Sequence, residues 1–270
     1  GRGTATSKSP NPQGPKPLPP TPETMRLILL GTAGYHPNDR RHTACVLLPE
    51  CGLMFDAGTA VFRAAEYLAL PELDIFLTHA HLDHVVGLTF MHDVARAHPL
   101  RRVAVHARPD NLRAIEEHLF AAGLFPTPPP FECRPLEAEY ALSDGGRLTH
   151  FPLEHRGGSI GYRIDWAERS MAYVTDTTAD PAAAYVEKLK GVDLLLHECY
   201  FSDDHADWAR KVGHSHTSKV AEVARRAGAG VLVLVHINPL ATADDPIGLD
   251  AAKAIFPNTI LGEDRMELEF

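Results

Sequence analysis

The feature that most constrains this chain is a cluster of potential metal ligands directly after an apolar segment. Asp74–Thr78 has the short apolar pattern of a buried β-strand. The next six positions contain the cluster, which consists of His79, His81, Asp83 and His84. Imidazole and carboxylate groups are the ligands that zinc and related divalent metals prefer. In a loop that leaves a strand, the first two histidines can converge on one ion and the last two residues can face a second. A polar loop with incidental histidines is the alternative, which this spacing disfavours.

Three further candidate ligands lie at distant points of the sequence. His155, Asp176 and His236 each follow an apolar stretch that we predict to be a strand. Polar side chains at strand ends are typical of a site built on the edge of a rigid sheet. Together with the cluster they make five histidines and two aspartates, enough for two ions that share one carboxylate. Asp176 is the natural bridge.

The chain as a whole has the composition of a globular protein. Its 270 residues are 44% hydrophobic and 23% charged, which excludes a largely disordered chain. Residues 1–24 are rich in proline and are expected to form a flexible tail, whereas residues 25–270 should form one domain. No apolar run approaches the roughly 20 residues that cross a bilayer, so we expect no membrane span and a cytoplasmic location.

The periodicity predicts a mixture of strands and helices. Strands are expected at residues 26–31, 44–49, 53–58, 74–78, 103–106, 147–151, 159–164, 171–175, 193–197 and 231–235, and helices at 59–70, 111–122 and 218–227. Residues 125–135 are proline-rich and are expected to be a surface connection. Strands dominate the first part of the chain, and later strands alternate with helices. This order indicates a layered α/β protein with sheets inside and helices outside.

The ordered ligand candidates resemble those of the metallo-β-lactamase fold, and within it ribonuclease Z and its phosphodiesterase relatives. Further motifs that carry the likeness are Leu30-Gly31-Thr32 with Pro37 and Arg41, Phe55-Asp56-Ala57-Gly58, Pro152-Leu153-Glu154-His155, Gly161-Tyr162-Arg163-Ile164, Thr175-Asp176-Thr177, His197-Glu198, Gly213-His214-Ser215 and His236-Ile237-Asn238-Pro239. The resemblance spans residues 26–240 and implies an α/β protein folded as a four-layer αββα sandwich. It also implies a two-metal site at one edge of the sheets.

The same resemblance implies how the ligands divide between two divalent ions. The first ion would be held by His79, His81, His155 and Asp176, and the second by Asp83, His84, Asp176 and His236. Zinc is the expected metal, and manganese, iron or cobalt could also occupy such a site. The implied enzyme is a two-metal hydrolase that attacks its substrate with a hydroxide bridging the ions.

Three residues are expected to act in catalysis. Asp83 would orient the hydroxide as well as bind metal. His214 would protonate the leaving oxygen as general acid, with Glu198 fixing its tautomer, and His216 is the nearby competitor.

Two less specific expectations concern neighbouring residues. The segment that holds His214 also has the pattern of a helix start, in which Ser215 or Thr217 would cap the helix. From their places in the motifs, Arg41 and Arg163 are expected to line the site.

One departure from ribonuclease Z bears on the substrate. Those enzymes carry a long basic arm that clamps tRNA, whereas residues 165–170 of this chain make only a turn, and the net charge is −9. We therefore expect a small or cyclic phosphodiester as substrate and no nucleic-acid partner. The alternatives are ribonuclease Z-type tRNA 3′ processing and hydrolysis of a lactone, thioester or sulfate ester. A homodimer is a further expectation, because dimers are common among the resembled enzymes.

Overall fold

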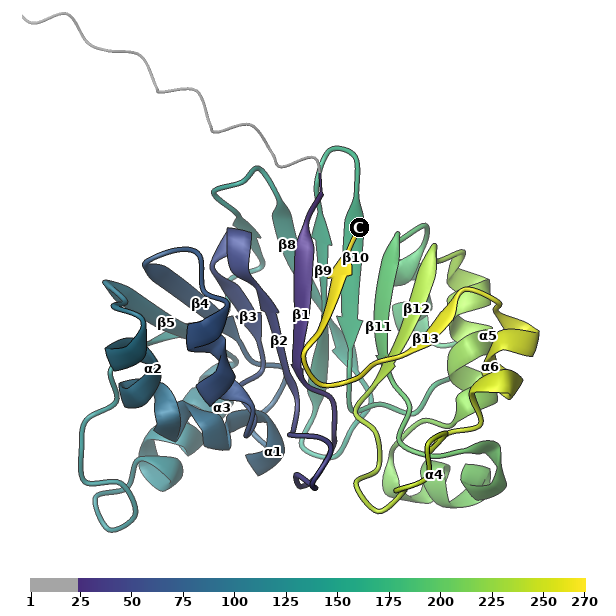
Figure 1. Ribbon diagram of the computed structural model, residues 1–270, viewed down its shortest axis with the longest axis horizontal. Coiled ribbons are helices and arrows are strands. Elements are labelled where there is room, and N and C mark those ends of the chain that lie inside the picture. Colours follow the sequence, from purple (N-terminus) through teal and green to yellow (C-terminus); the bar gives the residue numbers. More distant parts are fainter. Residues whose placement is uncertain (1–23) are drawn as a thin grey trace, which may run out of the picture.

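Two seven-stranded sheets pack face to face, with helices on their outer faces (Figure 1). The computed structural model describes residues 24–270. The layered arrangement confirms the predicted α/β αββα sandwich. The expected tail lies almost entirely outside the described residues, so the division at residue 24 stays a prediction. Within residues 24–270, no helix is long and apolar enough to span a bilayer.

The first sheet brings segments from opposite ends of the chain side by side, because β14 pairs with β1. Its strands, in spatial order, are β14 (Met266–Glu269), β1 (Arg26–Gly31), β2 (Cys45–Leu48), β3 (Leu53–Phe55), β4 (Glu72–Phe76), β5 (Arg102–Ala107) and β6 (Glu132–Pro135). The strands from β3 to β6 run parallel to one another, so their carboxyl ends lie at one edge.

The second sheet repeats this plan. Its strands, in spatial order, are β13 (Thr259–Leu261), β12 (Val231–Val235), β11 (Leu194–Glu198), β10 (Ser170–Val174), β9 (Ser159–Asp165), β8 (Arg147–Leu153) and β7 (Glu139–Ala141). The strands from β10 to β13 are parallel, whereas those from β7 to β10 are antiparallel.

The helices are short and cover the outer faces of the sheets (Figure 1). The α-helices are α1 (Leu82–Val85), α2 (Met91–Ala97), α3 (Pro109–Ala114), α4 (Ala206–Val212), α5 (Thr217–Ala227) and α6 (Leu249–Ile255). Short segments of other helix types are η1 (Pro49–Cys51), η2 (Val61–Glu66), η3 (Val86–Phe90), the π-helical η4 (Ile115–Leu119), η5 (Ala184–Leu189) and η6 (Asp203–His205).

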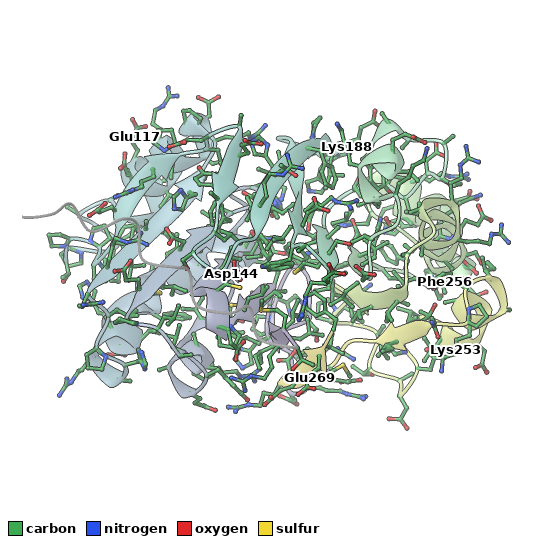
Figure 2. The ribbon with its side chains drawn as sticks, turned by 90° about the horizontal axis from the view of Figure 1, so that it is seen from above. Glu117, Asp144, Lys188, Lys253, Phe256 and Glu269 are labelled. Carbon is green, nitrogen blue, oxygen red and sulfur yellow. The ribbon has the colours of Figure 1, made fainter. Side chains whose placement is uncertain are left out.

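Three apolar layers hold the sandwich together. One lies between the sheets, where Phe55 stacks on Tyr162 and Tyr173 with ring centroids 5.1 and 5.6 Å apart. The other two lie between each sheet and its helices. Charged side chains such as Glu117 and Lys188 lie on the periphery (Figure 2). Burial of apolar surface in these layers is the main force that fixes the sheet edges in place.

Two local predictions are wrong. Residues 59–70 contain only the short 3₁₀ helix η2, which ends with the three-residue hydrogen bond of that helix type, from the Tyr67 N–H to the Ala64 carbonyl. Residues 125–135 are not wholly a connection, because Glu132–Pro135 pairs with β5 as strand β6. Pro135 is tolerated there because β6 is the edge strand.

Candidate metal centre

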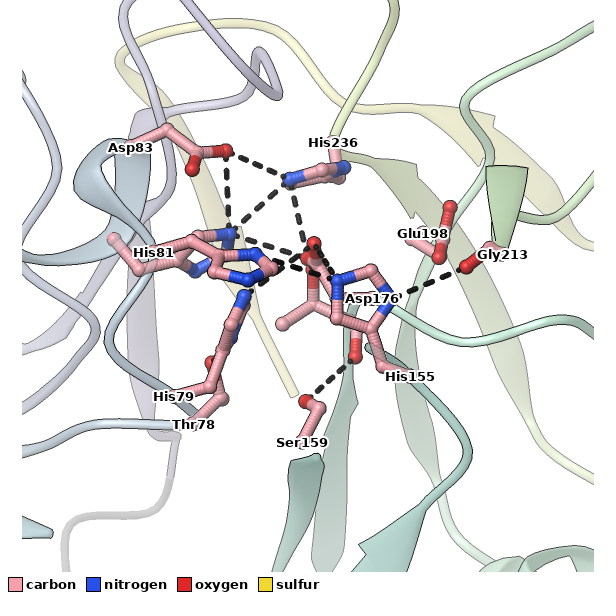
Figure 3. A network of polar contacts seen from close by, with 12 residues as sticks. Thr78, His79, His81, Asp83, His155, Ser159, Asp176, Glu198, Gly213 and His236 are labelled. Atoms are coloured by element: carbon pink, nitrogen blue, oxygen red, sulfur yellow. Dashed lines mark hydrogen bonds and ion pairs between the residues drawn. The ribbon is translucent and has the colours of Figure 1, made fainter. Parts of the chain in front are cut away.

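All seven predicted ligands meet at one edge of the sandwich (Figure 3). The segments that follow β4, β8, β10 and β12 supply them, so residues far apart in the sequence converge at the ends of four strands. The ligand atoms of His79, His81, His155 and Asp176 lie within 4.8 Å of one another. The structure thus brings together the residues that the sequence placed around two ions.

The two oxygens of Asp176 face two different groups of histidines. Oδ2 lies 3.6 Å from Nε2 of His79 and 3.4 Å from Nε2 of His155. Oδ1 lies 3.1 Å from Nε2 of both His84 and His236. A carboxylate so placed can share its oxygens between two ions, which is the bridging geometry.

Asp83 completes the second group. Its Oδ2 lies 3.4 Å from Nε2 of His84 and 3.3 Å from Nε2 of His236, and these two imidazole nitrogens are 3.2 Å apart. Two imidazoles and two carboxylates that converge at such distances are suited to bind a cation. His81 lies in the first group, with its Nδ1 3.4 Å from Nε2 of His155.

In three histidines, Nδ1 is hydrogen-bonded on the side away from the centre, which leaves Nε2 on the inner side free to act as a ligand. His84 Nδ1 donates to Asp56 at 2.8 Å, and His155 Nδ1 donates to the Gly213 carbonyl at 3.2 Å. His79 Nδ1 lies 3.0 Å from Thr78 Oγ1, which leaves its buried Nε2 without a hydrogen-bond partner. Such outer hydrogen bonds fix the tautomer of metal-binding histidines. The donor set therefore fits a pair of divalent ions.

Asp56 is a site residue whose role the sequence does not reveal. Its buried carboxylate accepts hydrogen bonds from the Thr78 N–H at 2.8 Å, from His84 Nδ1, and from the Tyr173 hydroxyl at 3.0 Å. It therefore orients His84 and anchors the start of the ligand cluster. The motif Phe55-Asp56-Ala57-Gly58 is the signal that could have pointed to it.

Strained backbone conformations concentrate around the centre. Within residues 24–270, the non-glycine residues with positive φ are Tyr35 (62°), Asp56 (56°), Asp176 (51°), His236 (57°) and Arg265 (66°). Four of these five belong to or adjoin the metal centre. Such conformations cost free energy and persist where the surroundings impose them, commonly at functional sites.

The electrostatics favour ionised carboxylates at the centre. Burial lowers the pKa of His79 well below its usual value, and the neighbouring charge of His84 lowers it further. Although burial opposes charge on His84, the carboxylates of Asp176, Asp83 and Asp56 raise its pKa well above the usual value. The surrounding histidines in turn hold the pKa values of Asp83 and Asp176 below their usual range despite burial. The ionised carboxylates of Asp83 and Asp176 therefore favour positive charge at the centre.

Glu198 and His214 form a hydrogen-bonded pair beside the ligands. The buried Glu198 accepts from the Thr177 N–H at 2.6 Å, and its two oxygens lie 3.2 Å from Nδ1 of His214. Although burial opposes it, Glu198 raises the pKa of His214 to about 9. The His214 ring lies 5.4 Å from that of His155 and 5.5 Å from that of His236.

The competing interpretations of the His214 segment do not agree with the structure. His216 Nδ1 bonds to Asp203 at 2.7 Å instead of pairing with Glu198. Asp203 also accepts the N–H of Ser218 at 2.8 Å, so it caps α5, and neither Ser215 nor Thr217 does. Ser215 Oγ instead donates to the Thr177 carbonyl.

The two arginines expected to line the site are engaged elsewhere. Arg41 is buried against the Glu263 carboxylate, at 2.8 Å. Arg163 pairs with Asp165 and donates to the Lys188 carbonyl at 2.9 Å. Both therefore stabilise the loops and sheet around them.

Comparisons with known proteins agree with this arrangement. Residues 53–237 match the family model of a beta-lactamase superfamily domain. Ribonuclease Z of Archaeoglobus fulgidus is 28% identical over 303 aligned residues, covering 91% of this chain and 97% of that protein. The alignment is longer than this chain, so the archaeal protein has segments with no counterpart here.

Two solved structures resemble the fold. The metallo-beta-lactamase fold protein YhfI from Bacillus subtilis has a TM-score of 0.75 at 19% identity, covering 92% of this chain and all of that one. A diphosphatase from the PhnP family has a TM-score of 0.70 at 22% identity, covering 92% and 97%. The fold and site define a metal-dependent hydrolase. The chain belongs to the beta-lactamase superfamily and has the metallo-β-lactamase fold.

Proposed function

We propose that the chain hydrolyses phosphodiesters with two divalent ions, zinc in the first instance. The ligands would be those that meet around the two oxygens of Asp176. The observation that carries the proposal is the Glu198–His214 pair beside the predicted ligands. In this pair a carboxylate contacts Nδ1 of the imidazole and leaves Nε2 to donate a proton, as acid catalysis requires. Hydrolysis of a diester needs such an acid, because the leaving oxygen must gain a proton.

When bound, two such ions supply a nucleophilic water at neutral pH and neutralise charge on the phosphate. The chain's own residues then orient and protonate the substrate. Glu198 takes the Nδ1 side of His214, so the proton for the leaving oxygen would come from Nε2. The Glu198 carboxylate stabilises the protonated form of His214. Asp83, one of whose oxygens faces both His84 and His236, would orient the attacking water.

His214 could also serve as a ligand. Its ligand atom lies within 4.8 Å of those of Asp176 and His236. The acid role is favoured because the carboxylate that His214 contacts is that of Glu198, whereas Nε2 of His84 and of His236 each lie 3.1 Å from Asp176 Oδ1.

Two substrate classes remain, and different observations favour them. The names of the curated relatives favour RNA, against the expectation that nucleic acid is no partner. The short connection from β9 to β10 and the net charge of −9 favour a small or cyclic diester, because this chain has no long arm there to grip tRNA.

A substrate panel tests the proposal and separates the classes. The metal-reconstituted protein, with zinc or manganese, would be offered bis(p-nitrophenyl) phosphate, 2′,3′- and 3′,5′-cyclic nucleotides, a tRNA precursor and a lactone. Cleavage of any diester that chelation abolishes supports phosphodiesterase activity. Cleavage at the 3′ end of the tRNA precursor, with little turnover of the small diesters, would assign the ribonuclease Z role. Turnover of the lactone alone would contradict the proposal.

A further inference from the structure

An exposed tyrosine is held against the metal centre by its own backbone. Tyr35 lies in the loop between β1 and β2, which Figure 1 places at the end of the sandwich where α1 lies. Its N–H donates to Asp83 Oδ2 at 2.7 Å, and its φ of 62° is unusual for a residue with a large side chain. Its side chain is nevertheless 74% exposed. The fold thus holds the backbone of Tyr35 in a strained conformation but leaves its ring exposed to solvent.

A second tyrosine lies against the rings of His214 and His236. Tyr200 follows β11, and its ring stacks on that of His214 with centroids 4.6 Å apart and planes inclined by 18°. The same ring lies 5.7 Å from that of His236. Tyr200 is therefore next to both the general acid and a predicted ligand.

The segments that carry the two tyrosines meet at one imidazole. Gly34, the neighbour of Tyr35, approaches His236 so closely that a Cβ on Gly34 would lie 2.3 Å from Cε1 of the ring. Tyr200 contacts the same ring. Segments from the first and second sheets thus bring two tyrosines, which we name the tyrosine pair, close to one imidazole of the site.

Two exposed leucines lie close to predicted ligands in the sequence. Leu82, between the ligands His81 and Asp83, is 68% exposed, and Leu240, four residues after His236, is 77% exposed. Single exposed apolar residues need no explanation, but several around a catalytic centre mark a surface that binds a ligand. The phosphate would occupy the metal centre, so these side chains would contact what is attached to it.

We propose that the tyrosine pair binds a flat aromatic ring attached to the phosphodiester, as in a nucleotide, and so determines the substrate specificity of the site. The inference rests on the proposed phosphodiesterase function. Aromatic side chains bind nucleobases by stacking with little dependence on sequence. Without a long arm at the β9–β10 connection, recognition would depend on such contacts close to the phosphate.

Binding of two matched ligands to the metal-reconstituted protein tests the inference by titration calorimetry. Adenosine 5′-monophosphate and ribose 5-phosphate carry the same phosphate and sugar, and only the first has a base. We expect the nucleotide to bind about tenfold more tightly, the gain typical of one stacked base. Tyr35→Leu should reduce this ratio toward one and change the ribose 5-phosphate affinity by less than about twofold.

Two control variants separate stacking from structure. Tyr35→Phe keeps the ring and should keep the ratio. Phe62→Leu removes an exposed aromatic ring that packs on His42, and it should also keep the ratio. A ratio near one in the wild-type protein, or an equal loss of both affinities in Tyr35→Leu, would overturn the inference. The binding measurement needs no turnover. A negative binding result would therefore contradict only the role of the tyrosines, whereas the proposed function would fail if no diester were cleaved.

Discussion

Replacing Asp56 by asparagine should weaken metal binding although Asp56 is not a predicted ligand. Asparagine tolerates the positive φ of this position and keeps the shape of the side chain. It replaces one carboxylate oxygen by an amide nitrogen, which cannot accept a hydrogen bond. In the wild-type protein, Asp56 Oδ2 accepts hydrogen bonds from His84 Nδ1 and the Tyr173 hydroxyl. If the asparagine oxygen keeps the bond to the Thr78 N–H, its amide nitrogen takes the place of Oδ2 and faces these two groups.

The size of the effect follows from these contacts. His84 would adopt the other tautomer, with its proton on the Nε2 that faces Asp176 at 3.1 Å. Loss of such an orienting partner typically lowers metal affinity by about 10–100-fold. A buried donor left without an acceptor also costs about 1–3 kcal/mol of folding stability. We therefore expect a folded variant with a lower melting temperature and one weakened metal site.

Competition against a chromogenic chelator measures the metal affinities, and thermal unfolding measures the stability. Tyr173→Phe is the matched control, because it removes one hydrogen bond to Asp56 and leaves His84 Nδ1 bonded. It should lose stability but keep both metal sites. Two unweakened sites in Asp56→Asn would refute the role assigned to Asp56.

Three other substitutions have defined outcomes. His214→Ala should keep its metal, seen by elemental analysis, and slow turnover by about 10²–10⁴-fold; loss of metal would make His214 a ligand. Gly34→Ala should displace His236 and lower metal affinity in the chelator assay. Gly123→Ala is the control, because a Cβ there meets nothing within 4 Å, and it should leave metal affinity unchanged. Equal metal affinities in the two variants would contradict the role assigned to the Gly34–His236 contact. Asp74 accepts hydrogen bonds from an arginine and a histidine of β5, which lower its pKa although burial opposes this. Asp74→Asn should therefore destabilise the protein at pH 7 by about 1–3 kcal/mol in denaturant titrations. Because stability from a depressed pKa is lost as pH falls, the difference from wild type should narrow below about pH 4; a constant difference would argue against the ion pair.

The strands that position the site could be predicted from the sequence, because they are buried on both faces and appear as continuous apolar runs. Val231–Val235 is strand β12, as expected. The sequence predicts no strand after residue 240, yet Met266–Glu269 forms β14 beside β1. Its residues alternate in burial, and its partner is at the other end of the chain, so only the tertiary fold reveals the pairing.

The side chains that converge at the candidate site could be predicted, because each follows an apolar strand and carries a metal-binding group. The residues that orient them could not. Asp56 reaches His84 only because β3 and β4 are parallel neighbours, a relation that local pattern does not encode. Arg41 was expected at the site, but Glu263, more than two hundred positions away, pairs with it.

The central claim is that side chains from separated strands bind two metal ions that carry out hydrolysis. Elemental analysis of the protein purified without chelators, beside Asp176→Ala, tests it most directly. We predict about two divalent transition-metal ions per wild-type chain, and loss of both metal and activity in the variant. A wild-type protein that contains no transition metal, or a variant that retains its full complement, would contradict the account.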